Sequence, residues 1–161
     1  SEPGQGTTIK IYLPRHVAGI PDGIAAPLPQ PRPRDGTETI LLAEDEDGIR
    51  RSVKRILELH GYTVLTAQDG VEALELVRRE PDRFQLLISD VIMPRMGGRE
   101  LHQTLRREAP ALRMIFTSGY TALDVAETSD LDASVPFLHK PWTIADLLAR
   151  VREVLDAPTS G

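Results

Sequence analysis

Side chains that could carry out chemistry follow directly after apolar runs in this sequence, and the most distinctive is a single carboxylate. The run Leu86-Leu87-Ile88-Ser89 leads into Asp90, and Pro94 follows four positions later. A short apolar run bounded by turn residues is typical of a strand buried on both faces, as in parallel sheets covered by helices. Asp90 is then expected at the carboxyl end of its strand, where open parallel sheets place their ligands and their chemistry.

A second group of acids is predicted to lie at the same edge. The apolar run 39–43 leads straight into Glu44, Asp45 and Glu46. Carboxylates brought this close to Asp90 would repel one another, and a bound divalent cation would remove that conflict. Ligands that are all oxygen atoms suit a hard ion such as Mg²⁺. The sequence therefore predicts a Mg²⁺ site at the carboxyl ends of these two strands.

A hydroxyl and an ammonium group extend the pattern to two further strands. The run 114–116 ends in Thr117 and Ser118, and the run 135–138 ends in His139, Lys140 and Pro141. Because right-handed crossovers bring the carboxyl ends of parallel strands to one edge, we expect Thr117 and Lys140 to lie beside the acids.

Helical patterns separate the predicted strands. Apolar residues recur at helical spacing from Ile49 to Leu57, and Gly61 is expected to end that helix. Possible capping boxes begin two others, formed by Asp69 with Glu72 and by Thr143 with Asp146. The remaining stripes are Leu101 with Leu105, a short fourth helix over 121–129, and a last helix with Ile144, Leu147, Leu148, Val151 and Leu155 facing inward. Strands alternating with five helices predict a doubly wound parallel α/β sheet.

With these residues in place, the chain resembles the receiver domain of two-component response regulators. The matching pieces are Glu44-Asp45, the segment from Asp90 to Gly98, Thr117, and Lys140-Pro141, each after a predicted strand and in the family's order. The resemblance covers roughly residues 38–157. It implies a flavodoxin-like sheet of five strands in the order 2-1-3-4-5.

The resemblance also implies roles for individual residues. Asp90 would accept a phosphoryl group from the histidine of a kinase, and the domain would catalyse this transfer and its own dephosphorylation. Mg²⁺ would be held by Glu44, Asp45, Asp90 and the backbone carbonyl of Ile92. Thr117 and Lys140 would contact the phosphoryl group, Phe137 would occupy the aromatic switch position, and Lys140-Pro141 would be a cis peptide. Glu44 departs from the family pattern, since many receivers have aspartate there.

Three other functions remain to be weighed against this one. A degenerate receiver would act as an interaction module without phosphorylation, but the set of acids, hydroxyl and lysine argues against it. A Mg²⁺ hydrolase with an aspartate nucleophile would need a second aspartate two residues later, where this chain has Ile92. Flavin binding would need a phosphate-cradling loop after the first strand, where this chain has acids.

The first 37 residues differ in composition from the rest. Seven of the 13 prolines lie there, which predicts a linker over residues 17–37. Before it, Gly4-Gln5-Gly6-Thr7-Thr8 and an alternating strand up to Leu13 resemble the end of a histidine-kinase ATP-binding domain. The predicted organisation is a kinase remnant over 1–16, the linker, a receiver over 38–157 and a tail over 158–161. This is the layout of a hybrid sensor kinase.

The amino-acid composition narrows the classes of partner that we expect. A net charge of -5 over 161 residues gives no basic surface for nucleic acid, and no segment approaches the length of a membrane span. The absence of cysteine fits a reducing compartment, so we expect a cytoplasmic domain without membrane contact. Expected partners are a histidine kinase domain, in the same chain or another, and a histidine phosphotransfer protein.

Overall fold

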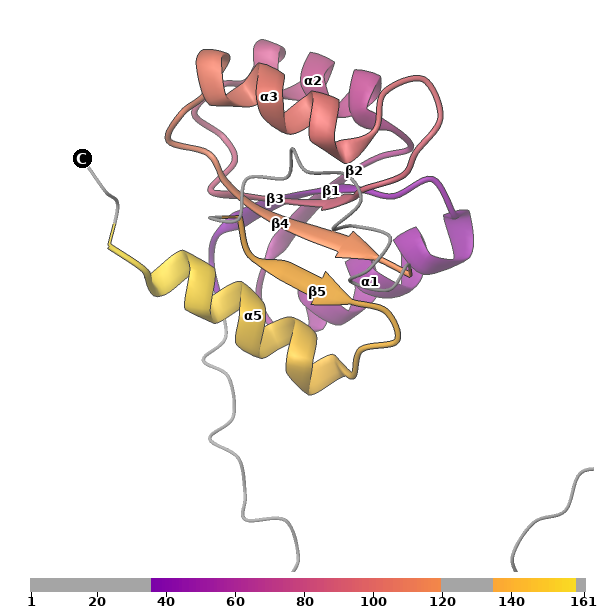
Figure 1. The fold of residues 1–161 in the computed structure, drawn as a ribbon. Helices are drawn as coiled ribbons and strands as arrows, with labels where there is room; N and C mark the ends of the chain where they lie inside the picture. Colours follow the sequence, from indigo (N-terminus) through magenta and orange to yellow (C-terminus); the bar gives the residue numbers. More distant parts are fainter. Residues whose placement is uncertain (1–35, 120–134, 159–161) are drawn as a thin grey trace, which may run out of the picture. The chain divides into compact units, whose positions relative to one another are not determined.

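Five short parallel strands form the centre of the fold (Figure 1). The computed structural model describes residues 36–119 and 135–158. The strands are β1 (Thr39–Ala43), β2 (Thr63–Ala67), β3 (Leu86–Asp90), β4 (Arg113–Ser118) and β5 (Phe137–His139). Their order in the sheet is β2-β1-β3-β4-β5, so the predicted doubly wound topology is confirmed.

The register of the sheet aligns the carboxyl ends of the strands. Asp90 at the end of β3 pairs with Thr117 of β4, and Ala43 at the end of β1 pairs with Ser89. Ser118 pairs with His139, the last residue of β5. The residues that follow β1 and β5 therefore come out at the same edge as Asp90.

Helices cover both faces of this sheet (Figure 1). The described helices are α1 (Asp47–Leu59), α2 (Gly70–Arg79), α3 (Gly98–Glu108) and α5 (Ile144–Asp156). Successive residues of a strand point to opposite faces. Accordingly, Ile40 and Leu42 of β1 pack with residues of α1 and α5, whereas Leu41 and Ala43 pack with residues of α2 and α3. Each fully buried leucine or isoleucine contributes about 1.5–3 kcal/mol to folding.

Local signals in the sequence fix several helix ends. Gly61 follows α1 with a positive φ of 90°, a conformation that glycine adopts without strain. The predicted capping box of Thr143 and Asp146 at the start of α5 is present. At the start of α2 the expected box is incomplete. The Asp69 side chain accepts hydrogen bonds from Val71 and Glu72, but the Glu72 carboxylate accepts from the backbone of Gln68 instead of Asp69.

The prediction that Ile144 of α5 faces inward is wrong. Ile144 is 51% exposed, whereas Leu147, Leu148 and Val151 are buried as expected. Side chains on a helix lean toward its amino terminus, so the side chain of the first residue projects past the helix end and not onto the sheet. Val154, near the other end of the helix, is buried although the sequence pattern did not single it out.

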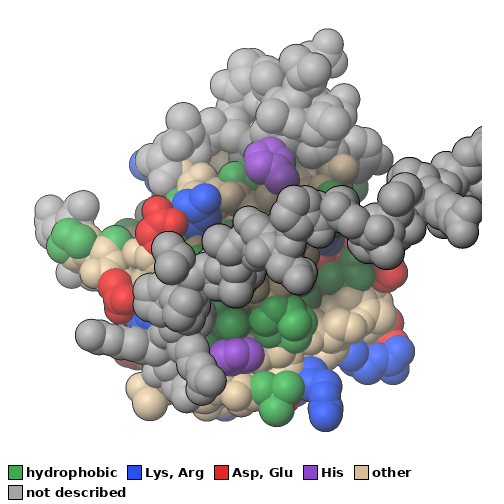
Figure 2. All heavy atoms as spheres, turned by 90° about the horizontal axis from the view of Figure 1, so that it is seen from below, with side chains coloured by type: hydrophobic (Ala, Val, Ile, Leu, Met, Phe, Trp, Pro, Cys, Tyr) green, Lys and Arg blue, Asp and Glu red, His purple; other side chains and the backbone are tan. Residues whose placement is uncertain are grey.

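Several expectations lie outside the described residues. These are the short fourth helix over 121–129, the kinase remnant, and all of the proline-rich linker except its last two residues. The chain divides into two units, residues 1–32 and 33–161, and every described residue belongs to the second. Among the described helices, none is long and apolar enough to cross a bilayer. On the described part of one face, acidic and basic side chains are interspersed with hydrophobic ones (Figure 2).

Candidate functional site

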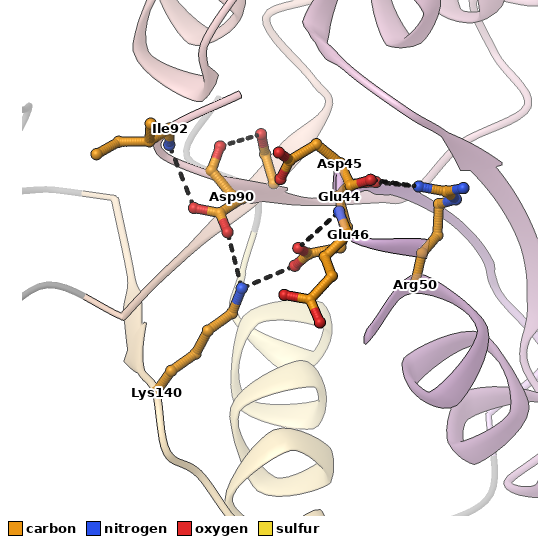
Figure 3. Close-up of polar contacts among 8 residues, drawn as sticks. Glu44, Asp45, Glu46, Arg50, Asp90, Ile92 and Lys140 are labelled. Atoms are coloured by element: carbon orange, nitrogen blue, oxygen red, sulfur yellow. Dashed lines mark hydrogen bonds and ion pairs between the residues drawn. The ribbon is translucent and has the colours of Figure 1, made fainter. Parts of the chain in front are cut away.

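Three carboxylates meet at the carboxyl edge of the sheet. Ligand oxygens of Glu44, Asp45 and Asp90 all lie within 4.8 Å of one another. Glu44 and Asp45 come from the loop between β1 and α1, and Asp90 is the last residue of β3 (Figure 3). Glu46, the third acid of the first run, is exposed and is not part of this group. The fold therefore selects three of the four predicted acids.

Lys140 bridges two of these acids. Its Nζ lies 2.8 Å from Glu44 Oε2 and 2.7 Å from Asp90 Oδ2 (Figure 3). The backbone N–H of Lys140 donates to the carbonyl of Ser118 at 2.8 Å, which ties the end of β5 to the end of β4. The Lys140-Pro141 peptide is cis, as the resemblance implied. Together these contacts aim the ammonium group at Asp90.

Asp90 is partly buried but accessible. Its side chain is 13% exposed, and Oδ1 accepts a hydrogen bond of 3.2 Å from the backbone N–H of Ile92. The Ile92 side chain is 57% exposed and points away from the acids (Figure 3). One carboxylate oxygen of Asp90 thus contacts Lys140 while the other contacts the backbone of the following loop.

The two predicted switch residues lie on neighbouring strands. Thr117 is buried in β4 beside Asp90, and its carbonyl accepts from the N–H of Val91 at 3.0 Å. Phe137 in β5 is partly buried, with its ring centre 6.4 Å from that of Phe116 and 4.5 Å from that of His139. The structure places Thr117 next to Asp90, and the roles of Thr117 and Phe137 in switching stay predictions.

Burial and charge oppose each other within this cluster. Burial raises the pKa of Glu44 above its ordinary value, and this effect outweighs the lowering by the Lys140 ammonium. For Lys140, burial lowers the pKa, but the hydrogen bonds to Asp90 and Glu44 prevail and the pKa is raised. Lys140 pairs with two of the three carboxylates, so the site has a deficit of positive charge.

The residues fit a hard divalent cation. All the side chains that could bind it offer oxygen, the donor that Mg²⁺ prefers, and Mg²⁺ needs only one or two carboxylates besides water. A cation here would supply the positive charge that the cluster lacks. Glu44, Asp45 and Asp90 are the residues that would hold it.

Two arginines near the site were missed by the sequence reasoning. Arg50 of α1 contacts the backbone of the acidic loop, and Arg95 of the loop after β3 pairs with the buried Asp69 at the start of α2. The sequence signal was weak in both cases, because an arginine on a helix or in a loop is usually solvated. Only the folded loops show what these side chains contact.

Comparison with known proteins identifies the family of this chain. Residues 40–152 match the family described as response regulator receiver domain. The sensor kinase CckA of Brucella abortus is 38% identical over 97% of this chain, which spans 17% of that kinase. The response regulator receiver protein CpdR of the same organism is 36% identical over 73% of this chain and 97% of its own length.

A solved structure shows the same fold. The crystal structure of the receiver domain from the hybrid histidine kinase CckA superposes with a TM-score of 0.58 and 38% sequence identity. The superposition covers 73% of this chain and 98% of that domain.

Proposed function

Because this chain belongs to the response regulator receiver domain family, we propose that Asp90 accepts a phosphoryl group from a histidine kinase. The observation that supports this most directly is the contact of Lys140 with Asp90 and Glu44 within a cluster of three carboxylates. An aspartate in a solvated turn is not expected to contact a lysine within a cluster of carboxylates. The cluster puts a nucleophile, a charge-stabilising ammonium and ligands for a cation within one site.

The nucleophile of the transfer is the carboxylate of Asp90. A carboxylate oxygen of Asp90 forms a bond to phosphorus while the bond between phosphorus and the donor's imidazole nitrogen breaks. The electron pair of that bond returns to the imidazole, and the product is an aspartyl phosphate. Because the Asp90 side chain is 13% exposed, a partner's phosphohistidine has to approach from the solvent side of the sheet edge.

Neighbouring groups stabilise the charge that moves with the phosphoryl group. Lys140 would keep its ammonium beside Asp90 and contact the phosphoryl oxygens after transfer. Thr117, aligned with Asp90 in the sheet, would donate its hydroxyl to the phosphoryl group. Phe137, on the strand next to Thr117, would then change its packing and pass the signal to the surface around β5 and α5.

Mg²⁺, bound by Glu44, Asp45, Asp90 and the Ile92 carbonyl, would screen the negative charge of both reactants. The extra methylene of Glu44 compared with aspartate allows a longer reach from the β1 end. This reach determines whether Glu44 binds the ion directly or through a water molecule.

A hybrid sensor kinase is the parent protein that we propose. The similarity to the CckA sensor kinase extends over 97% of this chain and so includes sequence before the receiver domain. The donor would then be the histidine of a kinase domain in the same or a second copy of the chain. A histidine phosphotransfer protein is the partner proposed for onward transfer.

Phosphoramidate, a small phosphoryl donor, tests the acceptor residue without a kinase. We expect a single phosphoryl adduct by intact-protein mass spectrometry in Mg²⁺, and much less when EDTA removes the metal. The variant Asp90→Asn should form none. The matched control is Asp82→Asn, an exposed acid in the turn between α2 and β3, which should be labelled like the parent.

Two outcomes would contradict the proposal. Equal labelling of Asp90→Asn and parent would assign the chemistry to another residue. No labelling of a folded parent by phosphoramidate or by a histidine kinase would instead favour an interaction module that works without phosphorylation.

A further inference from the structure

Arg50 contacts the acidic loop from the side opposite to Lys140 (Figure 3). One of its terminal nitrogens, Nη1, donates to the carbonyl of Glu44 at 2.7 Å and to that of Asp45 at 3.1 Å. The other, Nη2, donates to the Asp47 carboxylate at 2.9 Å. A single guanidinium therefore contacts the backbone of the first two acids after β1, Glu44 and Asp45.

These contacts constrain the direction of the two carboxylates. The N–H of Glu44 is already bonded to the carbonyl of Ala67 in β2, and its carbonyl is bonded to Arg50. With the peptide groups on either side of Glu44 and the carbonyl of Asp45 fixed, fewer backbone conformations remain for the loop. The side chains of Glu44 and Asp45 then point toward Asp90 (Figure 3).

The start of α1 has no side-chain N-cap. Glu46 is the N-cap residue, and its side chain accepts no capping hydrogen bond. Arg50, reaching back from the first turn of α1 to the loop, is the side chain that joins the helix to the acidic segment.

Pairing with Asp47 does not explain this arrangement. Arg51, the next residue, already pairs with the other oxygen of Asp47 at 2.6 Å, and its side chain is 75% exposed. The Arg50 side chain is only 18% exposed. Because a solvated ion pair contributes little, the burial of Arg50 against two carbonyls is better explained by its contact with the loop.

We propose that Arg50 is a positioning residue of the cation site, which holds the backbone of Glu44 and Asp45 so that their carboxylates converge with Asp90. This inference rests on the proposed function, since it assumes that the three carboxylates bind Mg²⁺. Outer groups that orient metal ligands typically change metal affinity by 10- to 100-fold when they are removed.

Electrostatics and positioning predict effects of opposite sign. A positive charge near a cation site weakens cation binding, so loss of the Arg50 charge alone would strengthen the binding of Mg²⁺. Loss of the positioning contacts would weaken it. The direction of the change therefore separates the two explanations.

The test compares Arg50→Gln with Arg51→Gln. The second variant removes the same charge from the next residue of the same helix. Mg²⁺ is titrated into each full-length protein, and dissociation constants are taken from amide chemical shifts near Asp90 and Lys140. We expect Arg50→Gln to bind Mg²⁺ about 10-fold more weakly, at the low end of the range for ligand-orienting groups. Arg51→Gln should stay within about two-fold of the parent, because its charge is exposed and screened by salt.

Three further measurements keep the result interpretable. Arg50→Lys retains the charge, but its ammonium nitrogen ends one bond short of the position that Nη1 occupies between the two carbonyls, so it should also weaken Mg²⁺ binding. In EDTA, exchange of the Glu46 amide hydrogen should be faster in Arg50→Gln than in Arg51→Gln, because the loop is less constrained without Arg50. Thermal unfolding of each variant establishes that the protein titrated is folded.

The failure of this inference differs from that of the proposed function. If the parent binds Mg²⁺ and Arg50→Gln binds it equally or more tightly, Arg50 is not a positioning residue. If the folded parent itself binds no Mg²⁺, the metal part of the proposed function is wrong and the inference is wrong with it.

Discussion

At the scale of single residues, the charge balance of the acid cluster is the main feature. Lys140 pairs with Glu44 and Asp90, whereas Asp45 forms no ion pair among the described residues. Asp45 is exposed, yet its carboxylate lies within 4.8 Å of the other two. In the absence of a cation, this carboxylate adds repulsion to the other two.

Asp45→Asn should therefore stabilise the metal-free protein. Two like charges about 4–5 Å apart repel by on the order of 1 kcal/mol in a water-like surrounding, and the neutral amide removes that repulsion. We expect a higher urea midpoint in EDTA, and a smaller increase in stability on adding Mg²⁺ than the parent shows. Equilibrium urea unfolding in both buffers measures both effects.

Glu46→Gln is the matched control for Asp45→Asn. It removes a charge from the adjacent acid, which lies outside the cluster. The free energy of unfolding in EDTA, and its increase on adding Mg²⁺, should therefore each change by no more than about 0.5 kcal/mol. A lower midpoint for Asp45→Asn than for the parent in EDTA would contradict the predicted repulsion.

At the scale of elements, the start of α2 is joined to the loop that follows β3. Asp69 is buried, caps α2 and accepts hydrogen bonds from the Arg95 guanidinium. Arg95 has a positive φ of 61°, which a residue other than glycine rarely adopts without compensating contacts. The N–H of Gly70 also donates to the carbonyl of Met96 at 3.0 Å. The contact between α2 and this loop helps to fix the segment that leaves Asp90.

The contribution of this contact should depend on pH. Burial raises the pKa of Asp69, but hydrogen bonds from the Glu72 N–H and Arg95 prevail, so the pKa lies below the ordinary value of 3.8. A carboxyl whose folded-state pKa is lowered stabilises the protein above its unfolded-state pKa, and this is lost as pH falls through the folded-state value. The stabilising effect of Asp69 should therefore be complete above about pH 5 and disappear at strongly acidic pH.

Asp69→Asn tests this dependence. Asparagine keeps an oxygen that can cap α2, so the variant loses mainly the charge pair with Arg95. Since Arg95 is half exposed, we expect a loss of about 1 kcal/mol near pH 7 in urea unfolding. The difference from the parent should shrink as the pH falls through the folded-state pKa of Asp69. A difference that stays constant across this range would show that the lost packing, not the charge, is responsible.

At the scale of the whole molecule, the first described residues already belong to the fold. The N–H of Gly36 donates to the carbonyl of His60 at 2.9 Å, and a Cβ atom at Gly36 would come within 1.9 Å of the Tyr62 ring. Glu38 pairs with Arg152 of α5 at 2.8 Å, and this hydrogen bond lowers the pKa of Glu38. These contacts connect the start of the described chain to its last helix.

Removing residues 1–35 should then cost the receiver domain little stability, because the core formed by the described residues runs from Ile40 to Val154. We expect the thermal midpoint to change by less than about 3 °C, the shift that roughly 1 kcal/mol gives in a protein of this size. Removing residues 1–38 also deletes the Gly36 and Glu38 contacts and should lower the midpoint by several degrees more. A large drop with the shorter deletion alone would place the amino-terminal segment in the folded unit.

The sheet and the edge at which the site lies could be predicted from local patterns in the sequence. Period and turn signals act over a few residues, so the apolar run before Asp90, the stop at Gly61 and the capping box at Thr143 could be recognised locally. Five strands separated by helices then permit few arrangements, because crossovers are right-handed. For this reason the carboxyl ends of β1 and β3 could be placed together before the structure was known.

The contacts that the side chains make at that edge follow from the packing of the folded chain. This packing separates Glu46 from the other acids, leaves Ile144 exposed, and brings Arg50 against the backbone of the acidic loop. It also joins Asp69 to Arg95, which are 26 residues apart. These contacts depend on the positions of segments that approach one another only after the core has packed, and no local pattern in the sequence specifies such positions.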